Sequence, residues 1–272
     1  MDVLKALFLG FLQGATEFLP ISSSGHLVLV PWWLGWGAPP LLFDVTVHMG
    51  TLVAVLMYFW RDWLALFRAG LGALRNRSFL QDPEARLLWL IVLGTLPAAL
   101  AGALLESVFE QAFASPLTVS LFLLVTAGLL VWSERVYTAE RTLRELAWRD
   151  ALAVGLAQAF AIFPGISRSG STIAMGMARG LSRPQAARFS FLLATPIILG
   201  AGAKQTLDVL SGAETLARAD MTPLAVGFVA AAGTGFVCIW FLMRLLQRWR
   251  LYGFAAYCAA LGTLSLLGVF LF

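Results

Sequence analysis

Six long apolar segments dominate the chain and restrict it to a membrane fold. Each is close to the roughly 20 residues that an α-helix needs to cross a bilayer. Hydrophobic residues make up 60% of the chain and charged residues only 12%, against about 25% charged residues in soluble domains. The composition excludes a soluble enzyme and a disordered chain and predicts an all-α polytopic membrane protein. The segments are Phe43–Trp60, Leu87–Leu105, Pro116–Trp132, Ala186–Gly202, Pro223–Met243 and Leu251–Phe272.

The arginines predict which side of the membrane each connection faces. Fifteen of the 19 Lys and Arg residues are arginines in four clusters, at 61–86, 135–149, 179–188 and 244–250. The positive-inside rule places these clusters in the cytoplasm, so the net charge of +4 reports orientation and not nucleic-acid binding. The connections 106–115 and 204–222 are expected outside, because they carry mostly acidic side chains: Glu106, Glu110, Asp208, Glu214 and Asp220.

Two further apolar stretches, Val3–Leu34 and Ala151–Met177, are interrupted by Pro, Ser and Gly. The second one follows Arg149 and precedes Arg179, both of which belong to cytoplasmic clusters. A segment that begins and ends on the same side must enter the membrane and return. We therefore predict a re-entrant helical hairpin at Ala151–Met177.

An internal repeat relates the two interrupted stretches. Shifting the sequence by 145 residues matches seven of 16 positions between Gly10 and Gly25. The apolar segments 87–105 and 223–243 correspond under this repeat but run in opposite directions, which predicts an inverted-topology repeat. The chain is then a single integral membrane domain, 1–272, with halves at about 1–135 and 150–272. By this symmetry Val3–Leu34 is a second re-entrant hairpin, entering from outside and meeting the first near the midplane.

Few ionisable residues fall inside the apolar stretches: Glu17, Asp44 and Arg168, with both histidines, His26 and His48. Each charge costs about 2.5–3.5 kcal/mol at the bilayer centre on insertion scales, so a fold retains it for pairing or for function. An ion pair that fixes helix register is the structural alternative to a functional site.

The two hairpin turns have the composition of an anion-binding site. Clustered Ser and Gly residues before a helix N-terminus offer N–H groups and hydroxyls to phosphate oxygens, and Arg168 can bind two such oxygens at once. Two facing turns suit a diphosphate. Close helix packing is the alternative for the small residues, and a bond to its own backbone is the alternative for Thr172. The candidate phosphate-binding residues are Gln13, Ser22, Ser24, Gly25, Ser167, Ser169, Gly170 and Thr172.

Asp44 and His48 are four residues apart and therefore share a helix face. They are either additional site residues or a helix-capping Asp with a satisfied His. No Cys and His cluster for a metal exists in the sequence. Glu17, with Gln13 on the same face, could hold a hard cation such as Mg²⁺ or Ca²⁺ if substrate phosphates supply the other oxygens.

Three motifs resemble the undecaprenyl pyrophosphate phosphatase family, the bacitracin-resistance proteins. They are the spacing of Gln13 and Glu17, the run from Glu17 to His26 (EFLPISSSGH), and the run from Pro164 to Thr172 (PGISRSGST). The resemblance extends over the whole chain in length, number of spans and order of motifs.

The resemblance implies an enzyme of the bacterial plasma (inner) membrane whose site faces outward. Such an enzyme hydrolyses undecaprenyl diphosphate to undecaprenyl phosphate and inorganic phosphate for peptidoglycan synthesis, with a divalent cation. Glu17 would be a metal ligand or base, Ser23 and His26 the suspected nucleophile and its partner, and Arg168 the diphosphate anchor. Gln13 stands at the variable first position of the family's acidic motif. The nucleophile stays open between Ser23, His26 and water, and a homodimer is compatible with the sequence.

A transporter or flippase of a polyprenyl phosphate lipid is the alternative, because inverted repeats with broken helices also build transporter sites. A purely structural membrane protein would not need charges and histidines concentrated in two matching turns.

Overall fold

The computed structural model describes residues 1–77, 79, 81–105, 115–211 and 221–271. Glu106, Glu110, Glu214 and Asp220, which we expected on the outer side, lie outside these ranges. The regular elements within them are helices: α1 Val3–Glu17, α2 Ser23–Trp33, α3 Leu41–Tyr58, α4 Trp60–Asn76, α5 Pro83–Leu104, α7 Pro116–Arg135, a short 3₁₀ turn at Leu143–Glu145, α8 Trp148–Phe160, α9 Arg168–Ala178, α10 Arg183–Leu210, α11 Met221–Leu245 and α12 Tyr252–Leu271.

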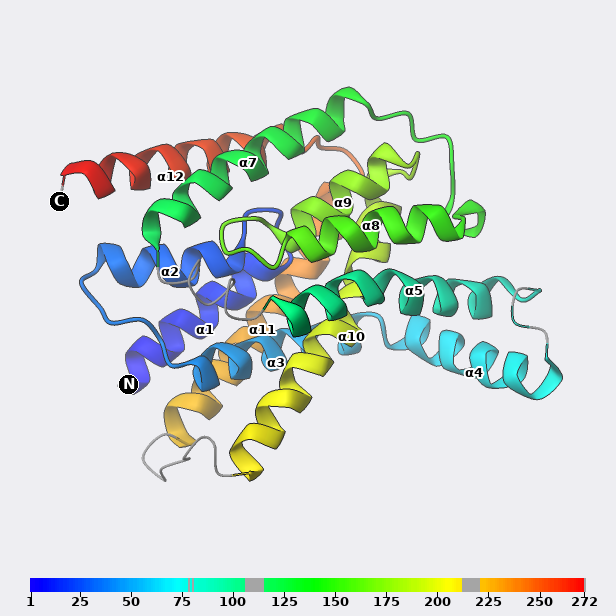
Figure 1. The fold of residues 1–272 in the computed structure, drawn as a ribbon, viewed down its shortest axis with the longest axis horizontal. Helices are drawn as coiled ribbons and strands as arrows, with labels where there is room; N and C mark the ends of the chain where they lie inside the picture. The colour runs from blue at the N-terminus through cyan, green and yellow to red at the C-terminus, as the bar shows by residue number, and fades with distance from the viewer. Residues whose placement is uncertain (78, 80, 106–114, 212–220, 272) are drawn as a thin grey trace.

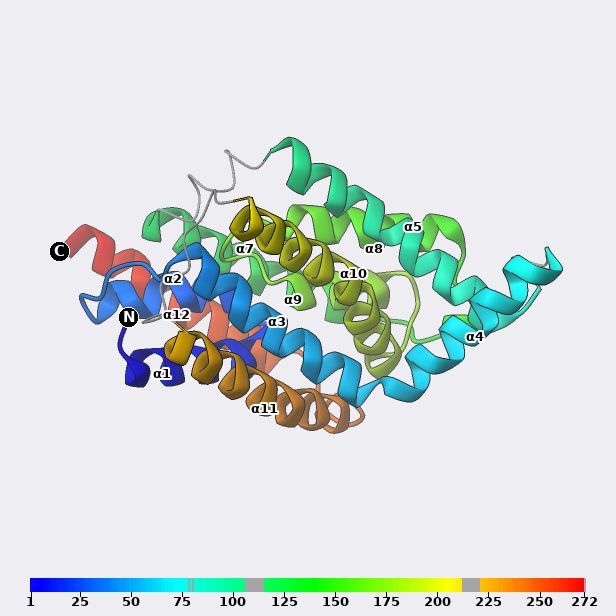
Figure 2. The same ribbon diagram turned by 90° about the horizontal axis from the view of Figure 1, so that it is seen from below.

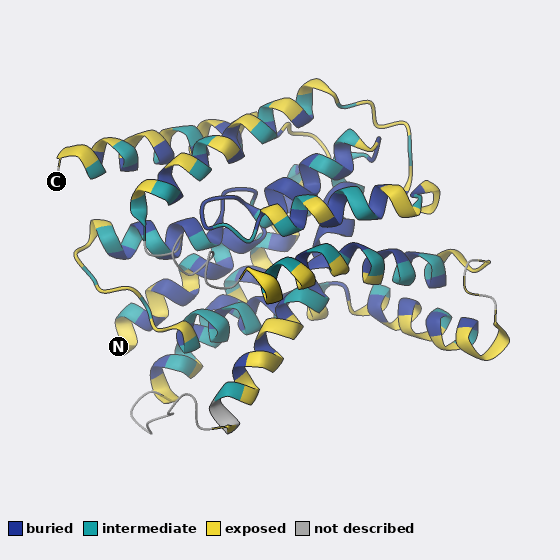
Figure 3. Ribbon diagram, in the orientation of Figure 1, coloured by how far each residue is buried: buried dark blue, intermediate teal, exposed yellow. Residues whose placement is uncertain are grey.

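Six of these helices are long and apolar enough to cross a membrane: α3, α5, α7, α10, α11 and α12. They coincide with the six predicted spans, with ends displaced by up to eight residues, the largest displacement being at the end of α10. Their outward faces expose large apolar side chains, such as Leu100, Phe241 and Phe270 (Figure 3). Exposed apolar surface of this extent marks a membrane-facing protein, and the prediction of an all-α multi-pass membrane protein is confirmed.

Helix starts follow from local capping chemistry. Ser115 accepts a hydrogen bond from the Thr118 N–H at 3.2 Å before Pro116 opens α7. Asp82 accepts from the Glu84 N–H at 2.8 Å before Pro83 opens α5. A polar cap followed by proline is a favoured start, because the cap satisfies one free N–H and proline lacks another.

The two interrupted stretches each fold as a helix–turn–helix hairpin. In Figures 1 and 2 the pair α1–α2 enters the bundle from the end that carries both termini, and the pair α8–α9 enters from the opposite end. Their turns meet at the centre, where the Ser169 hydroxyl donates to the Leu19 carbonyl at 3.0 Å. The hairpin shapes agree with the prediction, and their re-entrant placement in a membrane stays a prediction.

Each hairpin packs against a helix from the other half of the chain. A Cβ atom at Gly10 of α1 would lie 2.3 Å from the Gly227 carbonyl oxygen of α11. In the same way, a Cβ atom at Gly155 of α8 would lie 2.3 Å from the Gly94 carbonyl oxygen of α5. Gly10 and Gly155 are partners in the sequence repeat, so the matching contacts agree with it. The inverted orientation of the halves and their boundaries stay predictions.

Helix α4 is the element that the sequence analysis missed, since its residues were assigned to a cytoplasmic connection. It buries Trp63, Leu66, Gly70 and Ala73 on one face and packs against α5. Arg61, Arg68 and Arg75 lie on its exposed side. The helix is amphipathic, so its average hydropathy stays below that of a span even though its periodicity is helical.

Ion pairs join helix ends that carry the arginine clusters. Asp150, at the start of α8, accepts from Arg141 at 2.9 Å and from Arg179, at the end of α9, at 2.6 Å. Arg183 pairs with Glu134, and Arg188 pairs with Asp62. Burial would raise the pKa of Asp150, but hydrogen bonds from Arg141, the Ala147 N–H and Arg179 outweigh it and lower that pKa.

Candidate active site

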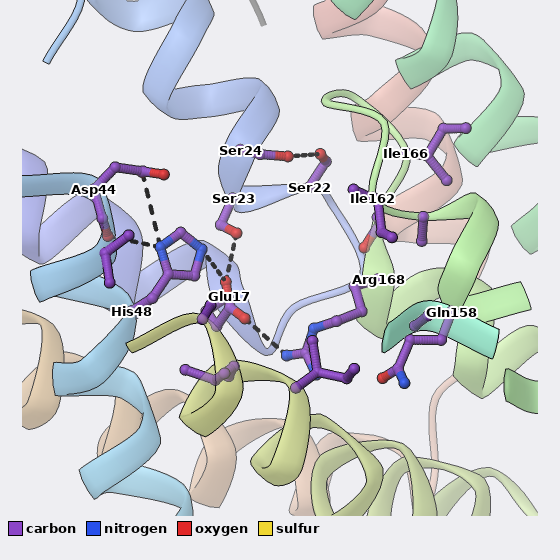
Figure 4. A pocket seen from close by; sticks show the side chains of 17 residues that line it. Glu17, Ser22, Ser23, Ser24, Asp44, His48, Gln158, Ile162, Ile166 and Arg168 are labelled. Atoms are coloured by element: carbon purple, nitrogen blue, oxygen red, sulfur yellow. Dashed lines mark hydrogen bonds and ion pairs between the residues drawn. The ribbon is translucent and has the colours of Figure 1, made fainter. Parts of the chain in front are cut away.

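A cavity of about 260 Å³ opens where the two hairpin turns meet (Figure 4). Both turns contribute to its wall, and helices α3, α5 and α10 complete it. Its polar lining consists of Glu17, Ser22, Ser23, Ser24, Asp44, His48, Gln158, Ser167 and Arg168. The apolar lining consists of Val45, Ala98, Ala161, Ile162, Ile166, Ile197, Ile198 and Ala201.

The Glu17 carboxylate is the centre of the polar lining. Its Oε2 accepts from the Ser23 hydroxyl at 2.5 Å and from the Gln13 side-chain amide at 2.8 Å. Its Oε1 accepts from Arg168 Nη2 at 2.7 Å. Ser23 and Arg168 are partners in the repeat, so corresponding positions of the two turns converge on one carboxylate. A buried carboxylate of this kind needs such hydrogen bonds, because burial of an unpaired charge is costly.

The first turn holds Ser23 at the start of α2. Ser22 precedes it with φ +69°, a conformation that side-chain-bearing residues rarely adopt and that costs about 1–3 kcal/mol. The Ser22 hydroxyl caps α2 by accepting from the Gly25 N–H at 3.2 Å. Ser22 and Ser24 line the cavity, and their hydroxyls lie 3.3 Å apart. Gly25 is buried behind them and does not line it.

The second turn repeats this cap with a relaxed backbone. The Ser167 hydroxyl accepts from the Gly170 N–H at 3.0 Å, and Ser167 has φ −70°. Of the hydroxyl residues predicted here, only Ser167 lines the cavity. Ser169 donates to the Leu19 carbonyl and so ties the two turns together. The Thr172 hydroxyl donates to the Arg168 carbonyl at 2.7 Å, which is the local backbone bond that we gave as its alternative.

Asp44 and His48 lie in the cavity beside Glu17. His48 Nδ1 bonds to the Asp44 carbonyl at 2.8 Å, which leaves Nε2 3.6 Å from Glu17 Oε2. Because Nδ1 donates its hydrogen to the backbone carbonyl, Nε2 is the ring nitrogen that can accept or donate a proton on the Glu17 side. The possible additional site residues are therefore brought to the site.

His26 does not line the cavity, although the resemblance made it the partner of Ser23. Its Nδ1 bonds to the Ser22 carbonyl and its Nε2 to the Tyr257 hydroxyl of α12, both at 2.7 Å. Both ring nitrogens are thereby occupied, and neither faces Ser23 or Glu17.

Two residues of the site were missed by the sequence analysis. Gln158 of α8 lines the cavity with a buried side chain whose amide oxygen and nitrogen have no hydrogen-bond partner among the described residues. Its signal was available, since Gln158 is the repeat partner of Gln13. Tyr257 has no sequence signal, because it lies in an apolar span distant from both turns.

The residues present accommodate a cation only together with a ligand that brings its own oxygens. Within the described residues no group of three or more His, Cys, Asp or Glu side chains could hold a metal ion. The Gln13 side-chain oxygen is buried without a partner there, next to the Glu17 carboxylate. Gln13 does not line the cavity, so Glu17 and Gln13 together offer at most two oxygen ligands, fewer than a hard cation requires.

Comparisons with known proteins identify the family of this chain. The family model described as bacitracin resistance protein BacA matches residues 6–264. An undecaprenyl-diphosphatase of Thermomicrobium roseum is 47% identical over 99% of each chain. Proteins of the same name from Methanosphaera stadtmanae and Rubrobacter xylanophilus are 42% and 43% identical over 98% and 97% of each chain. With a family match and full-length relatives of this kind, the chain belongs to the bacitracin resistance protein BacA family.

Proposed function

We propose that this protein hydrolyses undecaprenyl diphosphate to undecaprenyl phosphate and inorganic phosphate. The observation that carries the proposal is the buried Glu17 carboxylate, which binds the Ser23 hydroxyl and the Arg168 guanidinium in one cavity. A hydroxyl against a carboxylate is a nucleophile with its base, and an arginine anchors phosphate oxygens. The full-length relatives named undecaprenyl-diphosphatase support the same reaction.

The two sides of the cavity suit the two parts of a lipid diphosphate. Arg168 Nη1 and the Gln158 amide are buried without partners among the described residues, so they are available to phosphate oxygens. Another part of the lining is apolar, with Ala98 from α5 and Ile197, Ile198 and Ala201 from α10. We assign the first isoprene units to these apolar residues, because burial of apolar surface is favourable against an apolar ligand.

In the proposed reaction the Ser23 oxygen attacks the terminal phosphorus while its proton passes to Glu17. The bond from that phosphorus to the bridging oxygen breaks, and undecaprenyl phosphate leaves. Arg168 stabilises the negative charge that shifts onto the bridging oxygen. Water then attacks the phosphoserine, and Glu17 returns the proton to the departing Ser23 oxygen, which releases inorganic phosphate.

The proposal includes a divalent cation, Mg²⁺ or Ca²⁺, that arrives with the substrate. Glu17 and the side-chain oxygen of Gln13 would hold it together with phosphate oxygens. When bound, the cation supplies charge neutralisation of the diphosphate.

The proposed setting is the bacterial plasma membrane, with the site reached from the outer face. There the enzyme would return the spent lipid carrier of peptidoglycan synthesis to its monophosphate form. A homodimer is compatible with this role.

The test is release of inorganic phosphate from farnesyl diphosphate by detergent-purified protein, with and without a chelator of divalent cations. We expect chelator-sensitive release and a loss of at least roughly 100-fold in Glu17→Gln. Glu145→Gln is the matched control, since Glu145 is an exposed carboxylate on the 3₁₀ turn and its loss should leave the rate unchanged.

Absence of phosphate release from monodisperse wild-type protein supplied with Mg²⁺ or Ca²⁺ would overturn the proposed hydrolysis. The transporter alternative would then be measured as movement of a labelled polyprenyl phosphate across reconstituted vesicles. Phosphate release that persists in the presence of the chelator would overturn the proposed requirement for a divalent cation and leave the proposed hydrolysis standing.

A further inference from the structure

The two hairpin turns share one cap but differ in backbone strain. Ser22 and Ser167 are repeat partners, and each hydroxyl accepts from the N–H group three residues later. Ser22 nevertheless has φ +69°, whereas Ser167 has φ −70°. Something outside the cap must therefore hold Ser22 in its unfavourable conformation.

The two turns also differ in the residue that lies four positions after the capping serine. His26 occupies this place in the first turn, and its Nδ1 lies 2.7 Å from the Ser22 carbonyl oxygen. Ser171 occupies it in the second turn, and its hydroxyl has no partner among the described residues. The histidine is thus present at the strained turn and absent from the relaxed one.

The hydrogen bonds of His26 fix its protonation. A carbonyl oxygen only accepts, so Nδ1 must carry a hydrogen and donate it to Ser22. Both partners of the ring, a carbonyl and the Tyr257 hydroxyl, are uncharged, and the side chain is buried at 2% exposure. An ion would be costly there, so Nε2 is unprotonated and accepts the Tyr257 hydroxyl hydrogen at 2.7 Å. The two rings lie parallel, with 5° between their planes.

We propose that Tyr257 and His26 are positioning residues that hold the Ser22 peptide in its strained conformation, and so direct Ser23 at Glu17. Tyr257 fixes the tautomer of His26, and His26 holds the Ser22 carbonyl. Ser23 is the next residue, and its hydroxyl then lies 2.5 Å from Glu17. Neither positioning residue touches the reacting atoms. For its activity readout the inference rests on the proposed function.

The decisive experiment compares two amide substitutions at one position. In His26→Asn the amide nitrogen takes the place of Nδ1 and can still donate to Ser22, while in His26→Gln it takes the place of Nε2. We expect His26→Asn to retain kcat within about 10-fold of wild type, and His26→Gln to lose considerably more. The pH profile of His26→Asn should keep the wild-type shape, because His26 exchanges no proton with the substrate.

Tyr257→Phe tests the second hydrogen bond of the proposal, the one from the Tyr257 hydroxyl to His26. Loss of this one neutral hydrogen bond should lower kcat about 3- to 10-fold and leave KM unchanged. Tyr252→Phe is the matched control, because Tyr252 lies at the first position of the same helix, away from both turns. It should behave as wild type.

A second readout does not depend on activity. The chain has only two histidines, so ¹⁵N NMR of detergent-solubilised His48→Gln reports His26 alone. We expect the neutral Nδ1–H tautomer throughout roughly pH 5 to 8. Melting temperatures of all variants monitor folding.

Each outcome decides between a positioning and a chemical role. If folded His26→Asn and His26→Gln are equally inactive, or if His26→Asn loses one limb of the pH profile, His26 acts chemically and the inference is wrong. Wild-type rates in His26→Gln or Tyr257→Phe would contradict the positioning role of these two residues. An imidazolium form of His26 in the ¹⁵N NMR spectrum would also contradict it. If wild type releases no phosphate, the proposed function fails instead, and the NMR measurement still tests the hydrogen bonds of His26.

Discussion

At the scale of single residues, the site is organised around one carboxylate. Glu17 receives Ser23 from one turn and Arg168 from the other, and both hydrogen bonds are 2.7 Å or shorter. The serine and the arginine can therefore act on the same phosphorus without rearrangement of the turns. Preorganised charge of this kind is usually the largest contribution to catalysis.

Arg168→Ala should lower kcat/KM by roughly 100- to 1,000-fold, because the charge that develops in phosphoryl transfer loses its stabilising partner. Ser23 and Gln13 still bind Glu17 in this variant, so folding should be affected much less. Phosphate release and thermal melting measured on the same preparation separate the two effects. An Arg168→Ala protein that cannot be purified in a folded state would contradict the prediction.

Gln158→Leu should raise KM about 5- to 100-fold while stability stays equal or rises. The amide of Gln158 is buried without a partner among the described residues, so its removal costs the fold no hydrogen bond and relieves a desolvation cost of about 1–3 kcal/mol. A bound phosphate would lose that donor. Steady-state kinetics and melting curves check the pair of effects, and a destabilised variant with unchanged KM would place Gln158 in the fold alone.

Residues of the site could be predicted from the sequence where a charge in an apolar stretch or the internal repeat marked them. Glu17 and Arg168 stand out as charges in apolar stretches, and both lie in the site. His26 carried the same signal but faces Tyr257, 231 positions away in the chain. The direction of a side chain depends on the turn, and the φ of Ser22 has no sequence signature because serine rarely adopts it.

At the scale of elements, the spans and hairpins follow from hydropathy and charge, whereas the amphipathic helix α4 does not. Arg61, Arg68 and Arg75 of α4 recur every seven residues on one side. This spacing is compatible both with an irregular cytoplasmic loop and with an amphipathic helix. Packing of α4 against α5, with Trp63 and Leu66 buried, decides between the two, and the sequence does not contain that contact.

Gly155→Ala should destabilise the protein by about 1–3 kcal/mol, because its Cβ atom would lie 2.3 Å from the Gly94 carbonyl oxygen. Gly10→Ala should have a similar effect at the equivalent crossing with Gly227. Gly233→Ala is the control, since a Cβ atom there meets nothing within 4 Å, and better helix propensity should make it neutral or slightly stabilising. Melting in one detergent compares all three, and equal effects of Gly155→Ala and Gly233→Ala would contradict the close crossing.

Asp150→Asn should weaken the fold near neutral pH and have little effect in acid. The pKa of Asp150 is lowered in the folded protein, so its ionised form stabilises the fold above the unfolded pKa of about 3.9. That contribution disappears as the pH falls through the lower folded pKa. Melting temperatures of wild type and Asp150→Asn should therefore differ at pH 7 and converge toward pH 3. A constant difference over this range would show that the two arginines do not depend on the charge.

At the scale of the whole molecule, the site exists only because two hairpins from opposite ends of the bundle meet. Each turn alone is a capped helix start with small residues, which occurs in many membrane proteins without function. The convergence of Ser23 and Arg168 on Glu17 requires both halves of the chain. The sequence repeat could predict that the turns correspond, and the arginine clusters predicted that they approach from different sides.

This arrangement predicts the labelling pattern of single cysteines in sealed, right-side-out vesicles. With Cys238 and Cys258 replaced by alanine, cysteines at Asp2 and Gly37, which flank the α1–α2 hairpin, should both react with a membrane-impermeant maleimide. Cysteines at Arg149, in the first turn of α8, and at Ser182, just after α9, should react only after the membrane is permeabilised. If either hairpin crossed the membrane, its two flanking cysteines would react from different sides. The turns would then no longer approach from opposite faces, and the inverted repeat would be refuted.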